Sequence, residues 1–374
     1  MLPLSTRRAK RCSALTPLLK AVHRGGARRL STLPSSFSAI VASSFGGPEV
    51  LKLASRQMAE LPSLEAGQVL VEMHAAGVNP SDTYVRLGPH GPWAATPHLL
   101  PTLPFTPGKD GAGVVAAVGA GTAGALPVGS RVYTTGSVSG TYAEYAVCDA
   151  QHVRPLPDAV SFAQGACVGV PCATAHRALF TRGGAEAGDC IFVHGASGAV
   201  GLAAVQLAAA RGCHVVGSAS SAEGHAAVLG AGALAVVNHR EANYLEEARA
   251  ALPASSDGKF DIVLEMAAHA NLVADLSLLR RGGQVCIVGS KAQAVELNPR
   301  LLMAGEASLR GIFLPSSTAE ELDAIHAALF NEMARGTLTP VVAKQLALPE
   351  APAAHEEVMS TQGKAGNVVL IARE

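Results

Sequence analysis

Short apolar runs alternate with helix-forming segments through the second half of the chain. The runs have the length and composition of strands buried on both faces, and they are Cys190–His194, Cys213–Ala219, Ala233–His239, Lys259–Ala268 and Gln284–Ser290. Predicted helices between them include Leu202–Arg211 and Asn271–Gly283. Strands that alternate with helices predict an α/β fold with a doubly wound parallel sheet.

The first half of the chain has a different texture. Its apolar segments are short and separated by glycine turns, as in an antiparallel barrel-like lobe, and they are Gln68–Val78, Gly111–Gly121, Ser130–Thr135 and Thr141–Asp149. Gly366–Ala372 is predicted to return to this lobe as one more strand. The predicted domains are a leader over 1–37, a barrel lobe over 38–160, a doubly wound domain over 161–310 and a return to the barrel lobe over 311–374.

Length and composition fit this division into two lobes. The chain has 374 residues, of which 49% are hydrophobic and 16% charged, enough to fill two cores. Glycine, histidine, arginine or serine interrupts every apolar stretch short of the roughly 20 residues that a membrane-spanning helix needs. We therefore expect no transmembrane helix.

Charge is distributed unevenly along the chain. The first acidic residue is Glu49, and eight basic residues precede it: Arg7, Arg8, Lys10, Arg11, Lys20, Arg24, Arg28 and Arg29. A leader rich in arginine and serine predicts an organelle transit peptide and a mitochondrial location, with another organelle as the alternative destination. If the leader is instead a disordered basic tail or results from a misassigned start codon, a cytoplasmic location is expected. Without these eight, 21 basic residues face 29 acidic ones, a net charge of −8, which disfavours nucleic-acid binding.

The seven cysteines form no pattern that suits a metal or a disulfide framework. Their number is odd and no two have CxxC spacing. Most of them, such as Cys190 and Cys286, lie in apolar runs, where cysteine is usually a small buried side chain. The sequence predicts a reducing interior and no thiolate zinc site.

A glycine-rich turn follows the apolar run Cys190–His194. It contains Gly195, Ser197, Gly198 and Gly201, and a predicted helix and a second strand come after it. This strand–turn–helix–strand unit places a pyrophosphate at a helix N-terminus, where free amides and the helix dipole attract negative charge. The glycine spacing is GxxGxxG, and the surrounding pattern makes dinucleotide binding more specific than the glycines alone.

The end of the second strand indicates which dinucleotide binds. NAD enzymes have an acidic residue there for the ribose 2′-hydroxyl, whereas this chain has Gly217, Ser218, Ala219, Ser220 and Ser221. Ser218, Ser220 and the cation Arg240 therefore favour the 2′-phosphate of NADPH. Glu223 lies close in the sequence and weakens that argument.

Several segments give the chain a family resemblance. It is similar to medium-chain dehydrogenases/reductases, and within them it resembles the zeta-crystallin type of NADPH:quinone oxidoreductase. The similar segments start at about Ser38 and include FGGPEVLKL, GVNPSDTYVR, PFTPGKDGAGVVAAVG, GTYAEYA, VHGASGAVGLAAVQLA, NHREANY, LSLLRRGGQVCIVGS and LNPR. The resemblance implies a Rossmann domain, a GroES-like barrel lobe, a homo-oligomer, NADPH as cofactor and a quinone or other conjugated carbonyl as substrate.

The resemblance also assigns residues to the site. Tyr84 and Thr174 match residues near the nicotinamide, and His239 matches one on the adenosine side. The other implied cofactor contacts are Ser197, Gly198, Ala199, Val200, Ser220, Asn271, Val288, Gly289, Ser290, Lys291, Ile312, Phe313 and Leu314. Tyr84, Asn79 and Thr174 are the candidate catalytic residues. Ser220 and Gly224 depart from residues seen in some relatives.

Lys109 and Asp110 stand where zinc alcohol dehydrogenases have a histidine and a glutamate. Zinc there polarises poor electrophiles, whereas a quinone readily accepts electrons and needs stacking, exclusion of water and hydrogen bonds. We expect zinc-independent transfer in the cleft between the lobes. Lys109 and Asp110 are predicted to form an ion pair that braces this cleft.

Several alternatives stay open from the sequence. Asn79 before Pro80 holds its loop through an Asx-type turn or, as the minority interpretation, contacts substrate. An enone or 2-enoyl reductase would use the same hydride, with a tyrosine as proton donor. A role of another class, as an RNA-binding or crystallin-like structural protein, is the third possibility.

Overall fold

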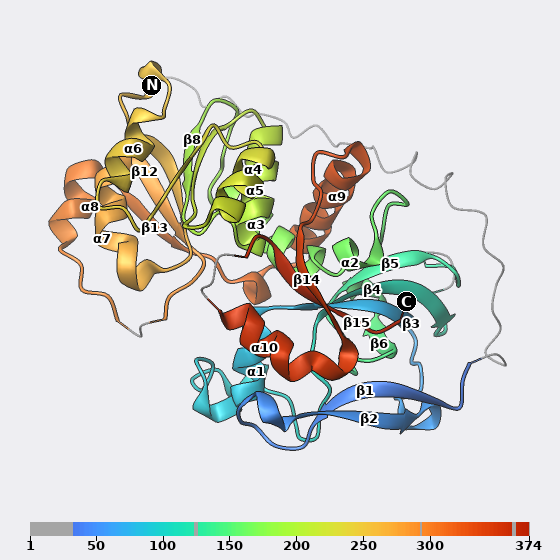
Figure 1. The fold of residues 1–374 in the computed structure, drawn as a ribbon. Helices are drawn as coiled ribbons and strands as arrows, with labels where there is room; N and C mark the ends of the chain where they lie inside the picture. The colour runs from blue at the N-terminus through green and yellow to red at the C-terminus, as the bar shows by residue number, and fades with distance from the viewer. Residues whose placement is uncertain (1–32, 123–125, 292–293, 361–363, 374) are drawn as a thin grey trace, which may run out of the picture.

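A computed structural model describes residues 33–122, 126–291, 294–360 and 364–373. Figure 1 shows two lobes side by side, one with the parallel sheet and one with the antiparallel strands. Most of the predicted leader lies outside the described residues, and the first strand, β1 (Ser36–Ala42), begins within its last residues. No helix of the described residues is long and apolar enough to span a membrane.

One lobe contains a six-stranded parallel sheet in the order β10-β9-β8-β11-β12-β13. Its strands are β8 (Cys190–Val193), β9 (His214–Ser218), β10 (Ala235–Val237), β11 (Phe260–Glu265), β12 (Leu279–Ile287) and β13 (Ser308–Gly311). Its helices are α4 (Ala199–Ala210), α5 (Ala222–Gly230), α6 (Tyr244–Ala250), α7 (Ala268–Leu278) and α8 (Pro299–Gly305). This order reverses between β8 and β11 and is that of a Rossmann domain, which confirms the predicted doubly wound sheet.

Local sequence explains most boundaries in the Rossmann lobe. All four residues of β8 are buried, as expected for a central parallel strand. Gly212 follows α4 with φ +86°, the left-handed conformation predicted for a glycine that ends a helix. The predicted helix over Asn271–Gly283 was too long: α7 ends at Leu278, and Leu279 begins β12 by pairing with Phe260.

The other lobe contains a seven-stranded sheet whose main path is β14-β15-β3-β4-β5-β7, with β6 paired to β3. Its strands are β3 (Gln68–Val78), β4 (Asp110–Val118), β5 (Arg131–Thr135), β6 (Tyr145–Asp149), β7 (Val153–Pro155), β14 (Val342–Ala347) and β15 (Asn367–Ile371). All pairs are antiparallel except β14 with β15. A hairpin of β1 and β2 (Leu51–Gln57), together with α1 (Pro80–Leu87), α2 (Phe162–Gly165) and α10 (Ala351–Met359), completes this lobe.

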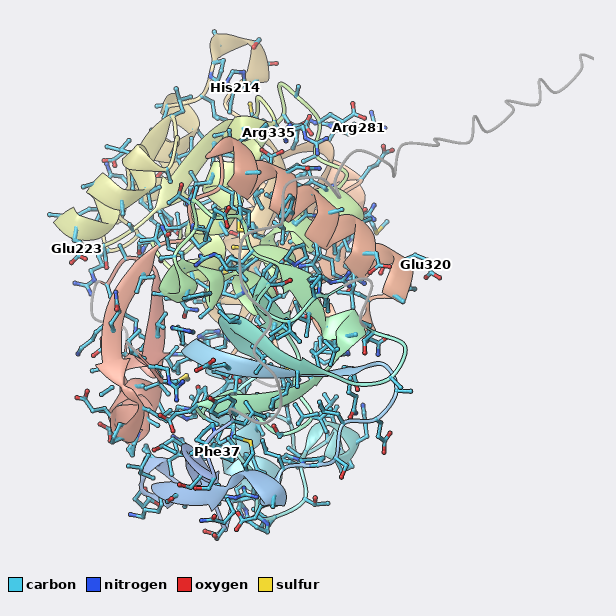
Figure 2. The ribbon with its side chains drawn as sticks, turned by 90° about the vertical axis from the view of Figure 1, so that its right-hand side faces the viewer. Phe37, His214, Glu223, Arg281, Glu320 and Arg335 are labelled. Atoms are coloured by element: carbon cyan, nitrogen blue, oxygen red, sulfur yellow. The ribbon has the colours of Figure 1, made fainter. Side chains whose placement is uncertain are left out.

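Helical segments and one shared core join the lobes. α3 (Ala173–His176) continues on both sides into π-helical turns, Val168–Cys172 and Arg177–Arg182, and packs on α4. α9 (Ala319–Arg335) lies beside it. A single hydrophobic cluster includes Tyr133 of the barrel lobe and Leu202 of the Rossmann lobe. Figure 2 shows the molecule from the side, with Phe37 at the barrel end and His214 at the opposite end.

Candidate active site

The predicted cofactor residues gather at one edge of the Rossmann sheet. Because its strands are parallel, their carboxyl ends share an edge. Gly195 to Val200 follow β8, Ser218 ends β9, and His239 and Arg240 follow β10. Asn271 lies on the helix after β11, while Val288 to Lys291 and Ile312 to Leu314 follow β12 and β13. The edge is where open α/β sheets bind ligands.

The glycine turn has the geometry expected for a phosphate. Gly195 has φ +58°, and Gly198 is the N-cap of the twelve-residue helix α4. A Cβ on Gly201 would lie 2.5 Å from the oxygen of Gly195, so only glycine lets α4 pack this close to the strand. The free amides of Ala199 and Val200 therefore stand at a helix N-terminus that attracts anions.

The serines at the end of β9 and after it differ in burial and in hydrogen-bond partners. Ser218 is buried, and its hydroxyl accepts a hydrogen bond from the amide of Gly195 at 3.2 Å. The side chain faces the glycine turn, and its contact with a 2′-phosphate stays a prediction. Ser220 is half-buried, Arg240 is exposed, and Ser221 caps α5 by accepting from the amide of Gly224. Ser220 and Arg240 remain the candidates for recognising the phosphate.

Hydrogen bonds hold the segments that contain the remaining cofactor candidates. Asn271 donates its side-chain amide to Glu265 at 3.3 Å. The amide of Lys291 donates to His269, and the amide of Ile312 donates to the oxygen of Ile287. These contacts hold the segments after β11, β12 and β13 together along the edge.

Asp110 connects the barrel lobe to the segment before Thr174. Its Oδ2 accepts hydrogen bonds from the side chain of Asn79 at 3.0 Å and from the amide of Val170 at 2.8 Å. The residue is fully buried, and burial raises the pKa of its carboxyl to about 7. Thr174 lies one turn beyond Val170 and is buried. Asp110 therefore fixes the candidate catalytic helix relative to Asn79.

Asn79 holds its loop. It is the N-cap of α1, its amide donates to Asp82 at 2.9 Å, and only 2% of the residue is exposed. Burial raises the pKa of Asp82 to about 6, and Tyr142 donates to the same carboxyl at 3.2 Å. Since the amide nitrogen of Asn79 is bound to Asp110, the structure supports the loop-holding interpretation over substrate contact.

Tyr84, Trp93 and Lys109 form a half-buried group beside α1. The rings of Tyr84 and Trp93 meet edge to face at 6.0 Å, and Nζ of Lys109 lies 5.7 Å from the centre of the Trp93 ring. The predicted ion pair of Lys109 with Asp110 was wrong, because the salt bridges of the described residues do not include this pair. Within the described part of the chain, the Tyr84 hydroxyl also makes no hydrogen bond, so aromatic, hydroxyl and ammonium groups are available together.

The two lobes also touch at the glycine turn. The amide of Gly366 donates to the oxygen of Ser197 at 2.9 Å, and Gly198 forms a bridge with Gly366. A cavity of about 10 Å³ between Cys167, Gln206 and Val341 is too small for a ligand. A larger cavity of about 610 Å³, lined by residues such as His74, Phe162 and Arg373, contains none of the predicted site residues.

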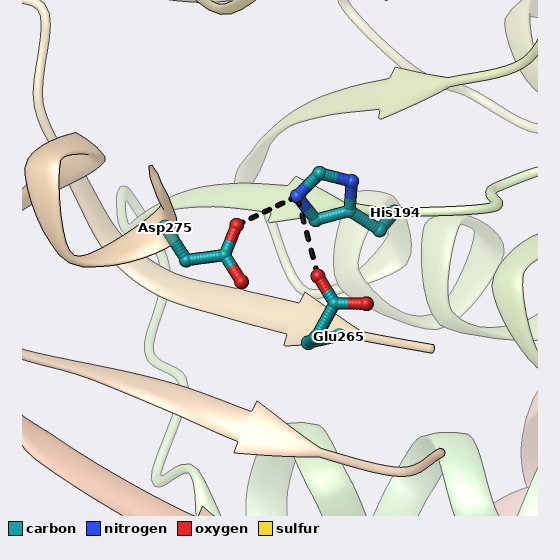
Figure 3. Close-up of side chains that lie close together, drawn as sticks. All are labelled: His194, Glu265 and Asp275. Carbon is teal, nitrogen blue, oxygen red and sulfur yellow. Dashed lines mark hydrogen bonds and ion pairs between the residues drawn. The ribbon is translucent and has the colours of Figure 1, made fainter. Parts of the chain in front are cut away.

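Sequence reasoning missed three features of this region. The first is Trp93, and the available signal was that it is the chain's single tryptophan. Asp110 was noticed only as a partner of Lys109. His194, Glu265 and Asp275 form a buried group (Figure 3), and the polar residues at the ends of two apolar strands were the available signal.

A Rossmann sheet joined to an antiparallel lobe with strand β15 returning to it is the fold of medium-chain dehydrogenases/reductases. The family described as alcohol dehydrogenase GroES-like domain matches residues 65–158, and the family described as zinc-binding dehydrogenase matches residues 199–329. The human quinone oxidoreductase is 44% identical over 327 residues, 87% of this chain and 95% of that protein. The pig quinone oxidoreductase is 42% identical over 91% of this chain and all of that protein.

Solved structures agree with this assignment. The Escherichia coli quinone oxidoreductase complexed with NADPH is 28% identical, with a TM-score of 0.74 over 89% of this chain and 99% of that chain. A mycobacterial protein complexed with NADPH is also 28% identical, with a TM-score of 0.77 over 90% of this chain and 99% of that chain. The chain belongs to the quinone oxidoreductase family.

Proposed function

We propose that the chain reduces quinones with NADPH and that this reaction uses no zinc ion. The observation that carries the proposal is that packed elements connect the proposed NADPH site with the proposed quinone site. The glycine turn opens α4, α4 packs on α3, and the turn before α3 is held by Asp110 beside the Tyr84–Trp93–Lys109 group. Relatives named quinone oxidoreductase cover nearly the whole chain and support the same assignment.

The residues at the sheet edge fit NADPH. The amides at the start of α4 suit the pyrophosphate, and no acidic side chain lies at Ser218 to Ser221 to repel a 2′-phosphate. Ser220 offers a hydroxyl and Arg240 a charge there. When bound, NADPH supplies the hydride.

The residues at positions 109 and 110 do not fit zinc. The ammonium of Lys109 has no free lone pair, and the carboxyl of Asp110 is buried and already bound to Asn79 and Val170. Reduction of a quinone does not require a Lewis acid, because the ring accepts electrons readily. The protein's part is to align the ring, exclude water and stabilise the negative charge that develops on oxygen.

The Tyr84–Trp93–Lys109 group can supply these functions. The face of Trp93 offers a stacking surface for a flat ring. Lys109 places a positive charge near that face, where it stabilises a developing oxyanion. The hydroxyl of Tyr84 is a hydrogen-bond donor, and burial raises its pKa, so it stays protonated at neutral pH.

The test uses the full-length chain after dialysis against a chelator. Oxidation of NADPH and NADH is followed with 9,10-phenanthrenequinone, 1,4-benzoquinone, a 2-alkenal and a simple ketone. We expect chelator-resistant turnover of the quinones with NADPH. Faster turnover of the alkenal would assign an enone reductase, and no turnover together with RNA binding would assign a binding protein.

Two further parts of the proposal concern the protein's environment. The basic leader supports a mitochondrial location, which imaging of the chain with and without residues 1–32 tests. The edge strand β13 and the exposed Met303 support a homo-oligomer formed through the Rossmann lobe. Light scattering of the purified protein measures its mass, and a monomer would contradict that arrangement.

A further inference from the structure

His194, Glu265 and Asp275 come from three elements and meet beneath the cofactor edge (Figure 3). His194 follows β8, Glu265 ends β11, and Asp275 lies on α7. Nε2 of His194 is 2.8 Å from Oδ1 of Asp275 and 3.4 Å from Oε2 of Glu265. At most 3% of each residue is exposed. Three ionisable groups are thus held together away from water.

Glu265 links this cluster to two segments of the proposed NADPH site. Its Oε1 accepts hydrogen bonds from the amide of Ala267 and, at 3.3 Å, from the side chain of Asn271. Its backbone oxygen accepts from the amide of Val288 at 2.8 Å. Asn271 and Val288 are both candidate cofactor contacts. Movement of Glu265 would therefore move both segments.

The cluster has no cation to balance two carboxylates. Among the described residues, His194 is the only ion-pair partner of Glu265 and Asp275, and one oxygen of each carboxyl accepts no hydrogen bond. Burial raises the pKa of each carboxyl to about 7 and lowers the pKa of His194. Two buried carboxyl groups this close favour retention of a proton.

Few other titratable groups face the cluster. Tyr244 of α6 has its ring 6.3 Å from that of His194, and burial raises its pKa, so it stays neutral. His239 after β10 is close enough to His194 to influence it, and burial lowers its pKa, so it too is neutral above pH 7. Neither group supplies the missing positive charge.

We propose that the cluster holds a proton that supports NADPH binding, with Glu265 as the positioning residue. While the proton is present, Glu265 stays beside Asp275 and keeps Asn271 and Val288 in place. When it is lost, the carboxylates repel each other and negative charge builds up beside His194, the residue that precedes the turn proposed to receive the pyrophosphate. Both effects weaken NADPH binding as the pH rises above neutrality. This inference rests on the proposed function, since NADPH is its ligand.

The experiment measures the Kd of NADPH by its fluorescence, from about pH 6 to about pH 9, on the full-length chain without quinone. The wild-type Kd should rise about three- to tenfold across that range, the effect of roughly one charge at roughly 10 Å in partly screened surroundings. Glu265→Gln keeps an amide oxygen for Ala267 and Asn271 but removes the shared ionisation. This variant should lose most of the rise in the Kd of NADPH.

Glu306→Gln is the matched control, because Glu306 is exposed on the same lobe and, among the described residues, forms an ion pair only with Arg281. It should keep the wild-type pH profile. If the Kd of NADPH rises with pH equally in wild type and Glu265→Gln, the inference is overturned. A pH profile that changes when a chelator is added would also overturn it, because it would indicate a bound cation. If Glu265→Gln does not fold, Asp275→Asn gives the same comparison. Wild-type protein that binds no NADPH at any pH would overturn the proposed function as well.

Discussion

Each lobe contains a pair of neighbouring buried carboxyl groups, and the two pairs have different partners. In the barrel lobe, Asp82 and Asp110 are bound by amide and hydroxyl donors that do not titrate near neutral pH. In the Rossmann lobe, Glu265 and Asp275 face a histidine. Burial raises the pKa in both places. Both pairs therefore couple pH to the stability of the fold, and the second pair also couples pH to the cofactor.

The largest expected effect is on the pH dependence of stability. The folded pKa of Asp110, about 7, lies above its ordinary value of 3.8, so the folded state binds the proton more tightly. The contribution of Asp110 is complete below about pH 4 and is lost as the pH rises to about 7, at most about 4 kcal/mol. Denaturant unfolding at several pH values should show a smaller loss in Asp110→Asn than in wild type, because Asp82, Glu265 and Asp275 still titrate in the variant.

Asp110→Ala should lower the free energy of unfolding by about 3 kcal/mol near pH 6. It leaves the side chain of Asn79 and the amide of Val170 buried without an acceptor. Asp110→Asn keeps a carbonyl oxygen and should cost about 1 kcal/mol. Urea unfolding measures both variants, and equal losses would show that these hydrogen bonds do not hold the junction.

Lys109→Met should lower kcat/KM for quinones about 30-fold, a loss of about 2 kcal/mol of charge stabilisation. The Kd of NADPH should not change, since Lys109 belongs to the proposed quinone site. Lys109→Arg should keep most of the activity. Lys52→Met, at an exposed position on β2, is the control. If Lys109→Met changes the Kd of NADPH and leaves quinone turnover unchanged, Lys109 belongs to the NADPH site and not to the quinone site.

Ser220→Asp should reduce the preference for NADPH over NADH about tenfold, because a carboxylate repels the 2′-phosphate and can accept from a 2′-hydroxyl. The KM for quinone should not move. Ser218→Asp would instead bury a charge beside Gly195 and weaken binding of both cofactors. Steady-state kinetics with each nucleotide distinguish the two positions, and an unchanged ratio in Ser220→Asp would remove it from phosphate recognition.

The smallest effect is expected at Trp93. Trp93→Phe keeps an aromatic face but reduces the stacking area, so the KM for quinone should rise about threefold with little change in kcat. Trp93→Ala should raise it further. If both variants keep the wild-type KM, the quinone does not stack on this ring.

The sequence predicted the Rossmann lobe well because its strands and helices follow one another along the chain. The pattern of apolar runs placed β8, α4 and β9, and parallel strands bring the predicted cofactor residues to one edge. The pattern failed at Leu279, where the chain leaves the predicted helix and pairs with Phe260 as the start of β12.

Side-chain partners were harder to predict. Asp110 binds Asn79 and Val170, which are 31 and 60 residues away, and His194 meets Asp275 over 81 residues. No local pattern identifies such pairs. The predicted pair of Lys109 with Asp110 relied on adjacency, but successive residues at a strand point to opposite sides. The sequence alone also did not show that the Ser218 side chain faces the glycine turn.

Helix α9 has a mechanical consequence for the whole molecule. Glu321 pairs with Arg177 of the junction at 2.5 Å, while Asp323 pairs with Arg154 and His326 with Tyr133 of the barrel lobe. Together with the shared core, these contacts of α9 oppose a hinge motion that would separate the lobes as rigid bodies. Access to the junction therefore depends on the loops around it, and the two lobes should melt in a single cooperative transition.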